Sequence, residues 1–197
     1  MAKKIFDLLF SFLGIFFISP VLLTIAFLIK SNDGGPIFYR GSRIGKNGKP
    51  FKIFKFRTMV IDAEKIGGPS TADDDPRITK VGKTLRKYKL DELPQLINVC
   101  KGEMSFVGPR PEVKQYVDMF SEEEKQILTV KPGITDWASL WNPDEGATLA
   151  GSPDPEKTYL ENIRPEKIRL QLKYVRERTF LTDIKIILLT FKTILLK

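Results

Sequence analysis

The strongest constraint on this chain is an almost unbroken apolar run at residues 5–29, IFDLLFSFLGIFFISPVLLTIAFLI, which contains one charged residue, Asp7. About 20 apolar residues are enough to cross the hydrocarbon core of a bilayer as a helix. The run therefore predicts a membrane helix near the N-terminus. A cleaved signal peptide is disfavoured, because the run is too long and no small-residue cleavage site follows it.

A serine–proline pair, Ser19-Pro20, stands near the middle of this run. Proline removes an intrahelical hydrogen bond, so we expect a break or bend there, and the serine hydroxyl can bond a carbonyl one turn back. Lysines flank both ends of the run (Lys3, Lys4 and Lys30), so the charges give no clear direction across the membrane. Physics alone leaves two arrangements: a kinked span, which is favoured because such kinks are common, and a re-entrant helix–break–helix that returns to the same face.

The C-terminal segment 180–197, FLTDIKIILLTFKTILLK, is also apolar, with charged residues spaced along it at Asp183, Lys185, Lys192 and Lys197. This pattern is typical of an amphipathic helix that lies in the membrane interface, where its lysines reach lipid headgroups. A helix that packs on the core of the protein fits the same pattern. The sequence leaves both possibilities open.

The composition restricts the chemistry that the chain can perform. Its 197 residues include no histidine and one cysteine, Cys100, so a Ser-His-Asp triad, a cysteine–histidine site and a Cys/His zinc site are excluded. The formal net charge of +8 favours anionic partners: nucleic acid, acidic lipid or phosphorylated metabolites. Catalysis would have to rest on carboxylates, lysine, arginine, tyrosine, backbone amides or a metal held by oxygen atoms.

A basic segment, residues 34–57, follows the apolar run directly and contains no acidic residue. Asn47-Gly48 near its middle is a strong signal for a β-hairpin. The charges can form an ordinary solvated face or can attract anionic lipid beside the membrane helix. The cationic residues of this segment are Arg40, Arg43, Lys46, Lys49, Lys52, Lys55 and Arg57.

Two adjacent acids, Asp91 and Glu92, lie in the segment KYKLDELPQLINV at residues 87–99. One interpretation is structural: Asp91 caps a helix that has Pro94 in its first turn. The other is chemical. An ionised aspartate can attack phosphorus, and an adjacent glutamate can hold magnesium, which prefers oxygen ligands and substrate phosphates. Both roles are compatible, since a helix N-terminus favours a carboxylate and an incoming phosphate.

A second candidate motif is Gly-Pro-Arg-Pro at residues 108–111. Pro109 and Pro111 restrict the backbone around Arg110, so its guanidinium is presented with little conformational entropy left to lose. A rigid loop with an incidental arginine is the simpler interpretation of this motif taken alone.

Several segments in the same order resemble the bacterial sugar transferase family: KFRTM (55–59), LDELPQLINVCKGEMSFVGPRP (90–111) and KPGIT (131–135). This family comprises monotopic phosphoglycosyl transferases that begin glycan assembly on polyprenol carriers. The resemblance implies an α/β fold, mostly helical with a small β-hairpin and interfacial amphipathic helices. It implies a re-entrant membrane helix at 1–30 that breaks at Ser19-Pro20, followed by a catalytic domain at 31–197. It also implies the small form of the family, with no multi-span bundle before the catalytic part.

The resemblance further implies the reaction. Family members transfer a phosphosugar from a UDP-sugar to a polyprenol phosphate, expected here to be undecaprenyl phosphate, and release UMP. Asp91 matches the family's nucleophile, which forms a phosphosugar–aspartyl intermediate, and Glu92 matches its ligand for Mg²⁺. The expected location is the cytoplasmic face of the bacterial inner membrane, with both termini cytoplasmic and no nucleic acid bound.

Other residues carry over as substrate contacts. Arg86 matches an arginine near the phosphates, and Arg110 with Pro109 and Pro111 matches a motif that binds the nucleotide or its phosphates. Lys55 and Arg57 are further candidates for anion contacts.

The chain departs from the family pattern at Asp136 and Ser139, so the resemblance identifies no sugar. A peripheral membrane scaffold and a nucleic-acid binder remain as alternatives. Neither explains Asp91-Glu92 together with Pro-Arg-Pro, and Mg²⁺-dependent release of UMP from UDP-sugars distinguishes the enzyme from both.

Overall fold

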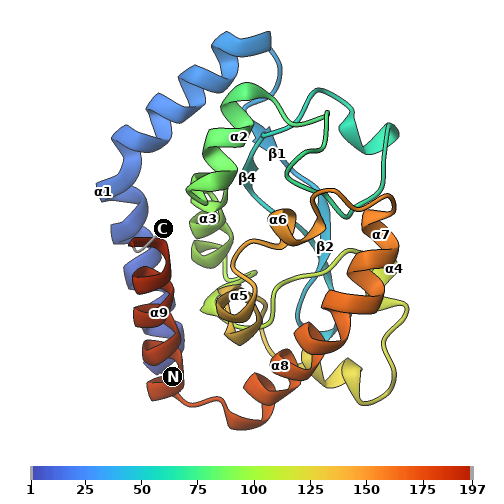
Figure 1. The fold of residues 1–197 in the computed structure, drawn as a ribbon. Helices are drawn as coiled ribbons and strands as arrows, with labels where there is room; N and C mark the ends of the chain where they lie inside the picture. Colours follow the sequence, from blue (N-terminus) through green and yellow to red (C-terminus); the bar gives the residue numbers. More distant parts are fainter. Residues whose placement is uncertain (1, 196–197) are drawn as a thin grey trace.

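The computed structural model describes residues 2–195, and the C-terminal Lys197 therefore lies outside the described residues. The fold is mostly helical with small sheets, which confirms the predicted α/β class (Figure 1). Its helices are α1 (Ala2–Asp33), α2 (Lys80–Lys87), α3 (Gln95–Cys100), α4 (Lys114–Val117), α5 (Trp137–Trp141), α6 (Glu145–Leu149), α7 (Pro155–Thr158), α8 (Arg164–Glu177) and α9 (Phe180–Leu195). Its strands are β1 (Phe38–Tyr39), β2 (Ser42–Ile44), β3 (Pro50–Lys52), β4 (Lys55–Phe56), β5 (Ser105–Val107) and β6 (Gly133–Thr135).

Three two-stranded sheets form among the described residues. Strands β2 and β3 pair antiparallel around Asn47 and Gly48, whose φ angles of 57° and 72° suit a tight turn, so the predicted hairpin is confirmed. Strands β1 and β4 pair antiparallel beside it. Strands β5 and β6 pair in parallel, Ser105 with Gly133 and Val107 with Thr135. Lys46, Lys49 and Lys52 of this hairpin are exposed, and their attraction to anionic lipid stays a prediction.

Helix α1 is continuous from Ala2 to Asp33 with Pro20 inside it, so the predicted break at Ser19-Pro20 does not interrupt the helix. The helix instead changes direction near its middle (Figure 1). The reason lies in one hydrogen bond. Pro20 has no N–H for the carbonyl of Phe16, and the hydroxyl of Ser19 donates to that carbonyl at 2.8 Å. The predicted back-bond of the serine therefore keeps the helix intact across the proline.

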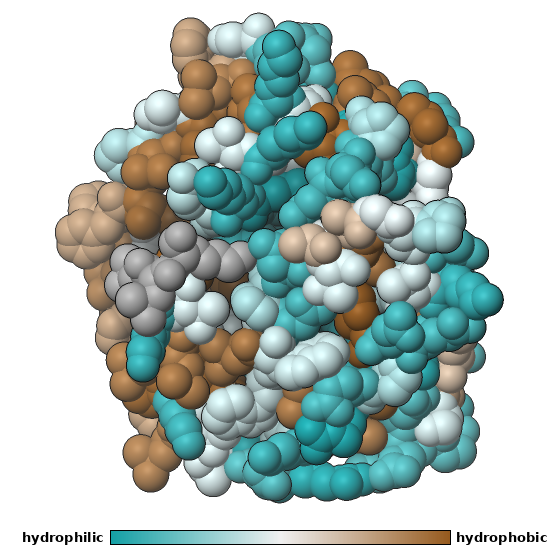
Figure 2. Space-filling view, viewed as in Figure 1, coloured by the Kyte–Doolittle hydropathy of each residue, from teal (hydrophilic) through white to brown (hydrophobic). Residues whose placement is uncertain are grey.

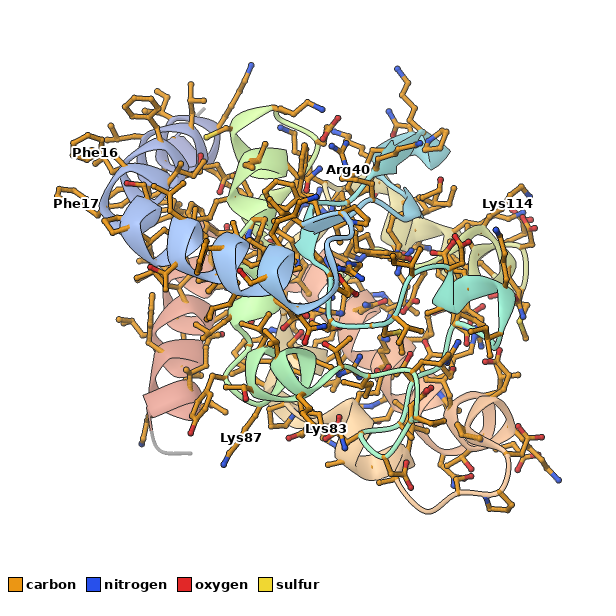
Figure 3. All side chains as sticks on the ribbon, turned by 90° about the horizontal axis from the view of Figure 1, so that it is seen from above. Phe16, Phe17, Arg40, Lys83, Lys87 and Lys114 are labelled. Carbon is orange, nitrogen blue, oxygen red and sulfur yellow. The ribbon has the colours of Figure 1, made fainter. Side chains whose placement is uncertain are left out.

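The outer face of α1 is apolar and exposed, while its inner face packs on the rest of the chain. It is the helix among the described residues that is long and apolar enough to cross a membrane, by length and composition alone. Phe16 and Phe17 project from it away from the other elements (Figure 3). Contacts run along both halves: Lys3 pairs with Asp183 of α9, and Ile29 packs in one cluster with residues of β4 and α2. Both ends of α1 thus contact the same globular part.

Helix α9 lies beside the N-terminal half of α1 and continues its apolar surface (Figures 1 and 2). Leu181, Leu188 and Phe191 are exposed, while Ile186 is fully buried in a cluster with residues of β5 and α8. The helix therefore has both a core-packing face and an exposed apolar face, so neither alternative from the sequence is sufficient alone. Asp183 is buried rather than directed to solvent.

Close backbone contact holds β5 against β6 at the start of the Pro-Arg-Pro loop. A Cβ atom built on Gly133 would lie 2.1 Å from the amide nitrogen of Gly108. The Gly133 amide donates to the Pro109 carbonyl at 3.0 Å, and the Gly108 amide donates to the Thr135 carbonyl at 3.1 Å. Only a residue without a side chain permits this approach.

We expect Gly133→Ala to lower the free energy of unfolding by about 2 kcal/mol, because the new methyl group has no space between the strands. Thermal unfolding of the detergent-purified protein should show a melting temperature lower by about 4–8 °C for a chain of this size. Gly68→Ala is the matched control, since its Cβ would meet its nearest atom, Glu156 Oε2, at 3.7 Å. Equal melting temperatures for the two variants would contradict this account of the β5–β6 contact.

Candidate active site

Asp91 and Glu92 lie in a 3₁₀ turn, Leu90–Glu92, between α2 and α3. The turn begins after Lys89, whose φ of 55° reverses the chain. The interpretation of Asp91 as a helix cap is wrong: Pro94 occupies the N-cap position of α3 and no side chain caps that helix. The short turn thus frees both carboxylates from capping and presents them to the interior of the molecule.

The carboxylate of Glu92 is bound by two cations. Arg110 donates to both of its oxygens, and Lys55 donates to Oε1 at 3.0 Å. The structure therefore brings together three predicted site residues from β4, the 3₁₀ turn and the Pro-Arg-Pro loop. Although burial opposes ionisation, these two cations hold the pKa of Glu92 well below its usual range. Reciprocally, the charge of Glu92 raises the pKa of Arg110, while burial lowers the pKa of Lys55.

Asp91 has a different environment from its neighbour. Its side chain is buried, yet among the described residues its carboxylate accepts no hydrogen bond. Burial raises the pKa of Asp91, and the charge of Glu92 adds to the rise, whereas the positive charges of Lys55, Arg86 and Lys89 oppose it. The result is a desolvated carboxylate whose oxygens are not committed to partners. Such a group is suited to act as a nucleophile or a base.

Two other predicted site residues, Arg86 and Arg57, differ in how firmly their guanidinium groups are held. Arg86 lines the same cavity as Asp91, with Nη2 3.8 Å from Asp73 Oδ1 and 3.4 Å from the carbonyl of Thr71, so it is only loosely held. Arg57 also lines the cavity but is tightly held by other partners. Its guanidinium pairs with Asp33 at the end of α1 and donates to the carbonyl of Pro36 at 2.7 Å. Arg57 therefore joins the end of α1 to the segment after β4, and because it also lines the cavity, its role as an anion contact stays a prediction.

The loop around Arg110 is fixed by residues that the sequence did not single out for this role. The Arg110 amide donates to Asp136 Oδ2 at 3.3 Å, and Asp136 is fully buried and caps α5 through the amide of Ser139 at 2.7 Å. The pattern Asp136-x-x-Ser139 is a recognisable capping signal. Its proximity to Arg110 depends on the β5–β6 pairing, which no local pattern reveals.

A buried ionic cluster lies directly after Pro111. Lys167 of α8 pairs with Glu112 at 2.8 Å and with Glu145 at 3.1 Å, and it donates to the hydroxyl of Tyr159 at 3.3 Å. The two carboxylates raise the pKa of Lys167 well above its usual range, and Lys167 in turn lowers the pKa of Glu112. The cluster fixes the C-terminal side of the Pro-Arg-Pro loop, which includes Pro111, against α8. The carbonyl of Pro109, on the other side, is bonded to β6.

A cavity of approximately 1380 Å³ joins these groups. Asp91, Glu92, Arg86, Lys55 and Arg110 all line it, together with the Lys167 cluster. Helices α1 and α9, which lie side by side at one edge of the molecule (Figure 1), and α6 all contribute residues to its lining. The apolar residues that α1 and α9 contribute are Phe6, Phe10, Ile18, Ile187, Phe191 and Ile194. The charged groups therefore share one cavity with an apolar wall built from the helices that carry the exposed apolar surface.

Asp91 and Glu92 are two residues that could offer oxygen ligands to a magnesium ion in this cavity. No group of three metal-binding side chains occurs among residues 2–195, so these residues offer no all-protein cage. Mg²⁺ is commonly bound by one or two carboxylates plus phosphate oxygens. Oε2 of Glu92 carries a single hydrogen bond, from Arg110, and so keeps a lone pair, and both oxygens of Asp91 are uncommitted.

Comparison with known proteins gives a consistent result. The model of the family described as bacterial sugar transferase matches residues 1–197. The UDP-glucose:undecaprenyl-phosphate glucose-1-phosphate transferase of Escherichia coli is 39% identical over 200 residues, which cover 96% of this chain and 39% of that protein. The UDP-N-acetylgalactosamine-undecaprenyl-phosphate N-acetylgalactosaminephosphotransferase of Aeromonas hydrophila is 36% identical over 196 residues, or 98% of this chain and 43% of that protein.

A third relative is similar over most of its own length. The exopolysaccharide production protein ExoY of Sinorhizobium fredii is 35% identical over 209 residues, which cover 98% of this chain and 84% of that protein. The chain thus spans less than half the length of the first two relatives and most of the length of the third.

The two adjacent acids should respond oppositely to conversion to amides. At pH 7 we expect Glu92→Gln to lower the free energy of unfolding by about 2 kcal/mol, because it leaves two largely buried cations without their partner. We expect Asp91→Asn to be neutral or stabilising, because the fold already disfavours the charged form of Asp91. Thermal unfolding of both variants beside the wild type measures the difference.

The same pair gives a pH test. A glutamate whose pKa is lowered by folding contributes stability above the pKa of the unfolded chain, about 4.3, and this contribution is lost as the pH falls from there toward the folded-state pKa. The difference in melting temperature between the wild type and Glu92→Gln should therefore narrow as the pH falls below about 4.3. A difference that is independent of pH would contradict the lowered pKa of Glu92.

Proposed function

The chain belongs to the bacterial sugar transferase family, and we propose that it transfers a phosphosugar from a UDP-sugar to a polyprenol phosphate at a membrane surface. The observation that carries this proposal is the cavity in which an unbonded, buried Asp91 shares space with three cations and an apolar wall. The cations suit the diphosphate of a water-soluble sugar nucleotide, and the apolar wall suits the chain of a lipid phosphate. Both substrates must reach the same reacting group. The names of two relatives, which act on undecaprenyl phosphate, support the class of acceptor.

The proposed chemistry proceeds in two displacements at one phosphorus atom. A carboxylate oxygen of Asp91 attacks the sugar-bearing phosphorus, the bond to the bridging oxygen breaks, and UMP leaves with that oxygen. An oxygen of the polyprenol phosphate then attacks the same phosphorus and releases the carboxylate, which gives the polyprenol-diphosphate sugar. One carboxylate can thus serve two bulky anions in turn. No histidine is needed, because both leaving groups depart as stable anions.

Arg86, Lys55 and Arg110 supply positive charge around the reacting phosphates. Lys55 and Arg110 are already balanced by Glu92 and Asp91, so near Asp91 mainly Arg86 and Lys89 remain to offset the negative charge of an incoming diphosphate. This imbalance supports a requirement for Mg²⁺, with Glu92 as its principal protein ligand. When bound, the ion would neutralise charge on the diphosphate.

The contacts of α1 support a re-entrant arrangement. If α1 crossed the bilayer, Lys3 would lie on the far side from Ile29, whereas both contact the same globular part. We therefore propose that both termini lie on the cytoplasmic face, where UDP-sugars are available, and that the bend at Pro20 lies deepest in the membrane.

The reaction is tested by UMP release from a panel of UDP-sugars, with polyprenol phosphate and Mg²⁺ present. We expect Asp91→Asn to abolish release while the protein stays folded and membrane-bound, and we expect wild-type protein quenched without acceptor to carry the phosphosugar mass on the peptide with Asp91. Asp118→Asn is the matched control, since Asp118 pairs with Lys114 on the surface. Substantial UMP release by Asp91→Asn would remove this residue from the nucleophilic role.

The topology is tested by cysteine labelling. In a Cys100→Ser background, Ala2→Cys should resist a membrane-impermeant reagent in intact spheroplasts and react after lysis. Labelling before lysis would refute the re-entrant arrangement. Replacing Ser19 and Pro20 with Ala and Leu should give a straight helix of spanning length. In that variant we expect the cysteine at position 2 to be labelled before lysis in part of the population, and we expect lower activity. Full activity in a variant that is completely labelled before lysis would show that the bend is not needed to position the active site.

A further inference from the structure

Two charged residues in the first turns of α1 reach the strand that leads to Arg110. Oδ1 of Asp7 accepts a hydrogen bond from the amide of Phe106 at 3.2 Å, and Nζ of Lys3 donates to the carbonyl of Val107 at 3.0 Å. Asp7 is buried, with 6% of its surface exposed. Burying a carboxylate on a largely apolar helix is costly, so the contact of Asp7 with β5 indicates a role beyond anchoring.

The contact of Lys3 belongs to a buried network at the end of β5. Lys3 pairs with Asp183 of α9 at 2.6 Å. The hydroxyl of Tyr174, in α8, lies 2.7 Å from Asp183 Oδ1 and 3.1 Å from the carbonyl of Val107. Tyr174 and Asp183 are both buried. Side chains of α1 and α8 therefore meet at one carbonyl of β5, and Asp183 of α9 accepts hydrogen bonds from both of them.

From Val107 the chain runs to Arg110 with a hydrogen bond at each step. The Gly108 amide and the Pro109 carbonyl bond to β6, and the Arg110 amide bonds to Asp136. This stretch has little freedom to adjust independently of β5. A displacement of β5 is thus passed to the guanidinium of Arg110 and to its partner Glu92.

We propose that Lys3 and Asp7 are positioning residues for Arg110, so that the active site is assembled only when the first half of the membrane helix is docked on β5. The inference rests on the proposed function and adds the dependence of its phosphate-binding arginine on α1. Misplacement of a catalytic group by about 1 Å is enough to reduce the rate by up to about a hundredfold.

The sequence supplies matched controls for each residue. Lys4 neighbours Lys3, carries the same charge and is exposed, so Lys4→Met removes one N-terminal positive charge without touching β5. Asp7→Asn keeps a side-chain oxygen for the Phe106 amide, whereas Asp7→Leu removes it. The double variant Lys3→Asp with Asp183→Lys exchanges the two charges and so restores an ion pair between these positions.

The test measures UMP release kinetics and amide hydrogen exchange at residues 105–111 in detergent. For Lys3→Met and Asp7→Leu we expect kcat to fall about tenfold or more, KM for the UDP-sugar to rise, and exchange at 105–111 to accelerate. Lys4→Met and Asp7→Asn should stay close to wild type, and the charge swap should recover part of the loss. A mere loss of folded protein would lower the apparent rate without raising KM.

Two outcomes overturn the proposal. One is the same kcat, KM and hydrogen exchange in Lys3→Met and Lys4→Met, which would mean that Lys3 acts only as one of several positive charges near the membrane. The other is unchanged exchange at 105–111 in Asp7→Leu. Failure of the proposed function is separate, since it would appear as an inactive wild type while the exchange comparison still decides whether α1 holds β5.

Discussion

The candidate site depends on the interaction of Glu92 with Lys55 and Arg110. These contacts join β4, the 3₁₀ turn at Leu90–Glu92 and the Pro-Arg-Pro loop, which are far apart in the sequence. Charge-assisted hydrogen bonds in a largely buried setting are stronger than neutral ones and fix direction as well as distance. Because Glu92 takes both cations, the carboxylate beside it remains free.

Helix α1 combines properties that a simple membrane anchor does not need. The hydroxyl of Ser19 replaces the hydrogen bond that Pro20 cannot donate, so the helix can bend without exposing a carbonyl to lipid. Its outer face is apolar, while Lys3 and Asp7 place polar groups on the main chain of β5. The helix therefore carries an exposed apolar surface and also contacts the strand that leads to Arg110.

The sequence predicts local features well and long-range partners poorly. Asn47-Gly48 predicts the hairpin, and the bond of Ser19 follows from its place before Pro20. The resemblance to the family assigns Glu92 and Arg110 to one site, but no local pattern predicts the ion pair between them. The sequence misses the use of Arg57 by Asp33, because a cation in a basic stretch has many possible partners and only the fold selects one. It also misses Asp183 as a buried ion-pair partner of Lys3, since an acid in an apolar helix resembles a surface residue until its neighbour is known.

Adjacent acids would normally repel each other and raise both pKa values. Here Lys55 and Arg110 stabilise the charge of Glu92, while Asp91 stays buried without a hydrogen-bond partner among the described residues. Burial makes the carboxylate of Asp91 more basic, while Lys55, Arg86 and Lys89 oppose its neutralisation. A carboxylate in this state is more reactive toward phosphorus than one held by several hydrogen bonds, because no partner has to be displaced before it attacks. The same absence of partners lowers the stability of the fold at Asp91, so the fold gives up local stability and keeps a carboxylate that is free to react, as the proposed nucleophilic role requires.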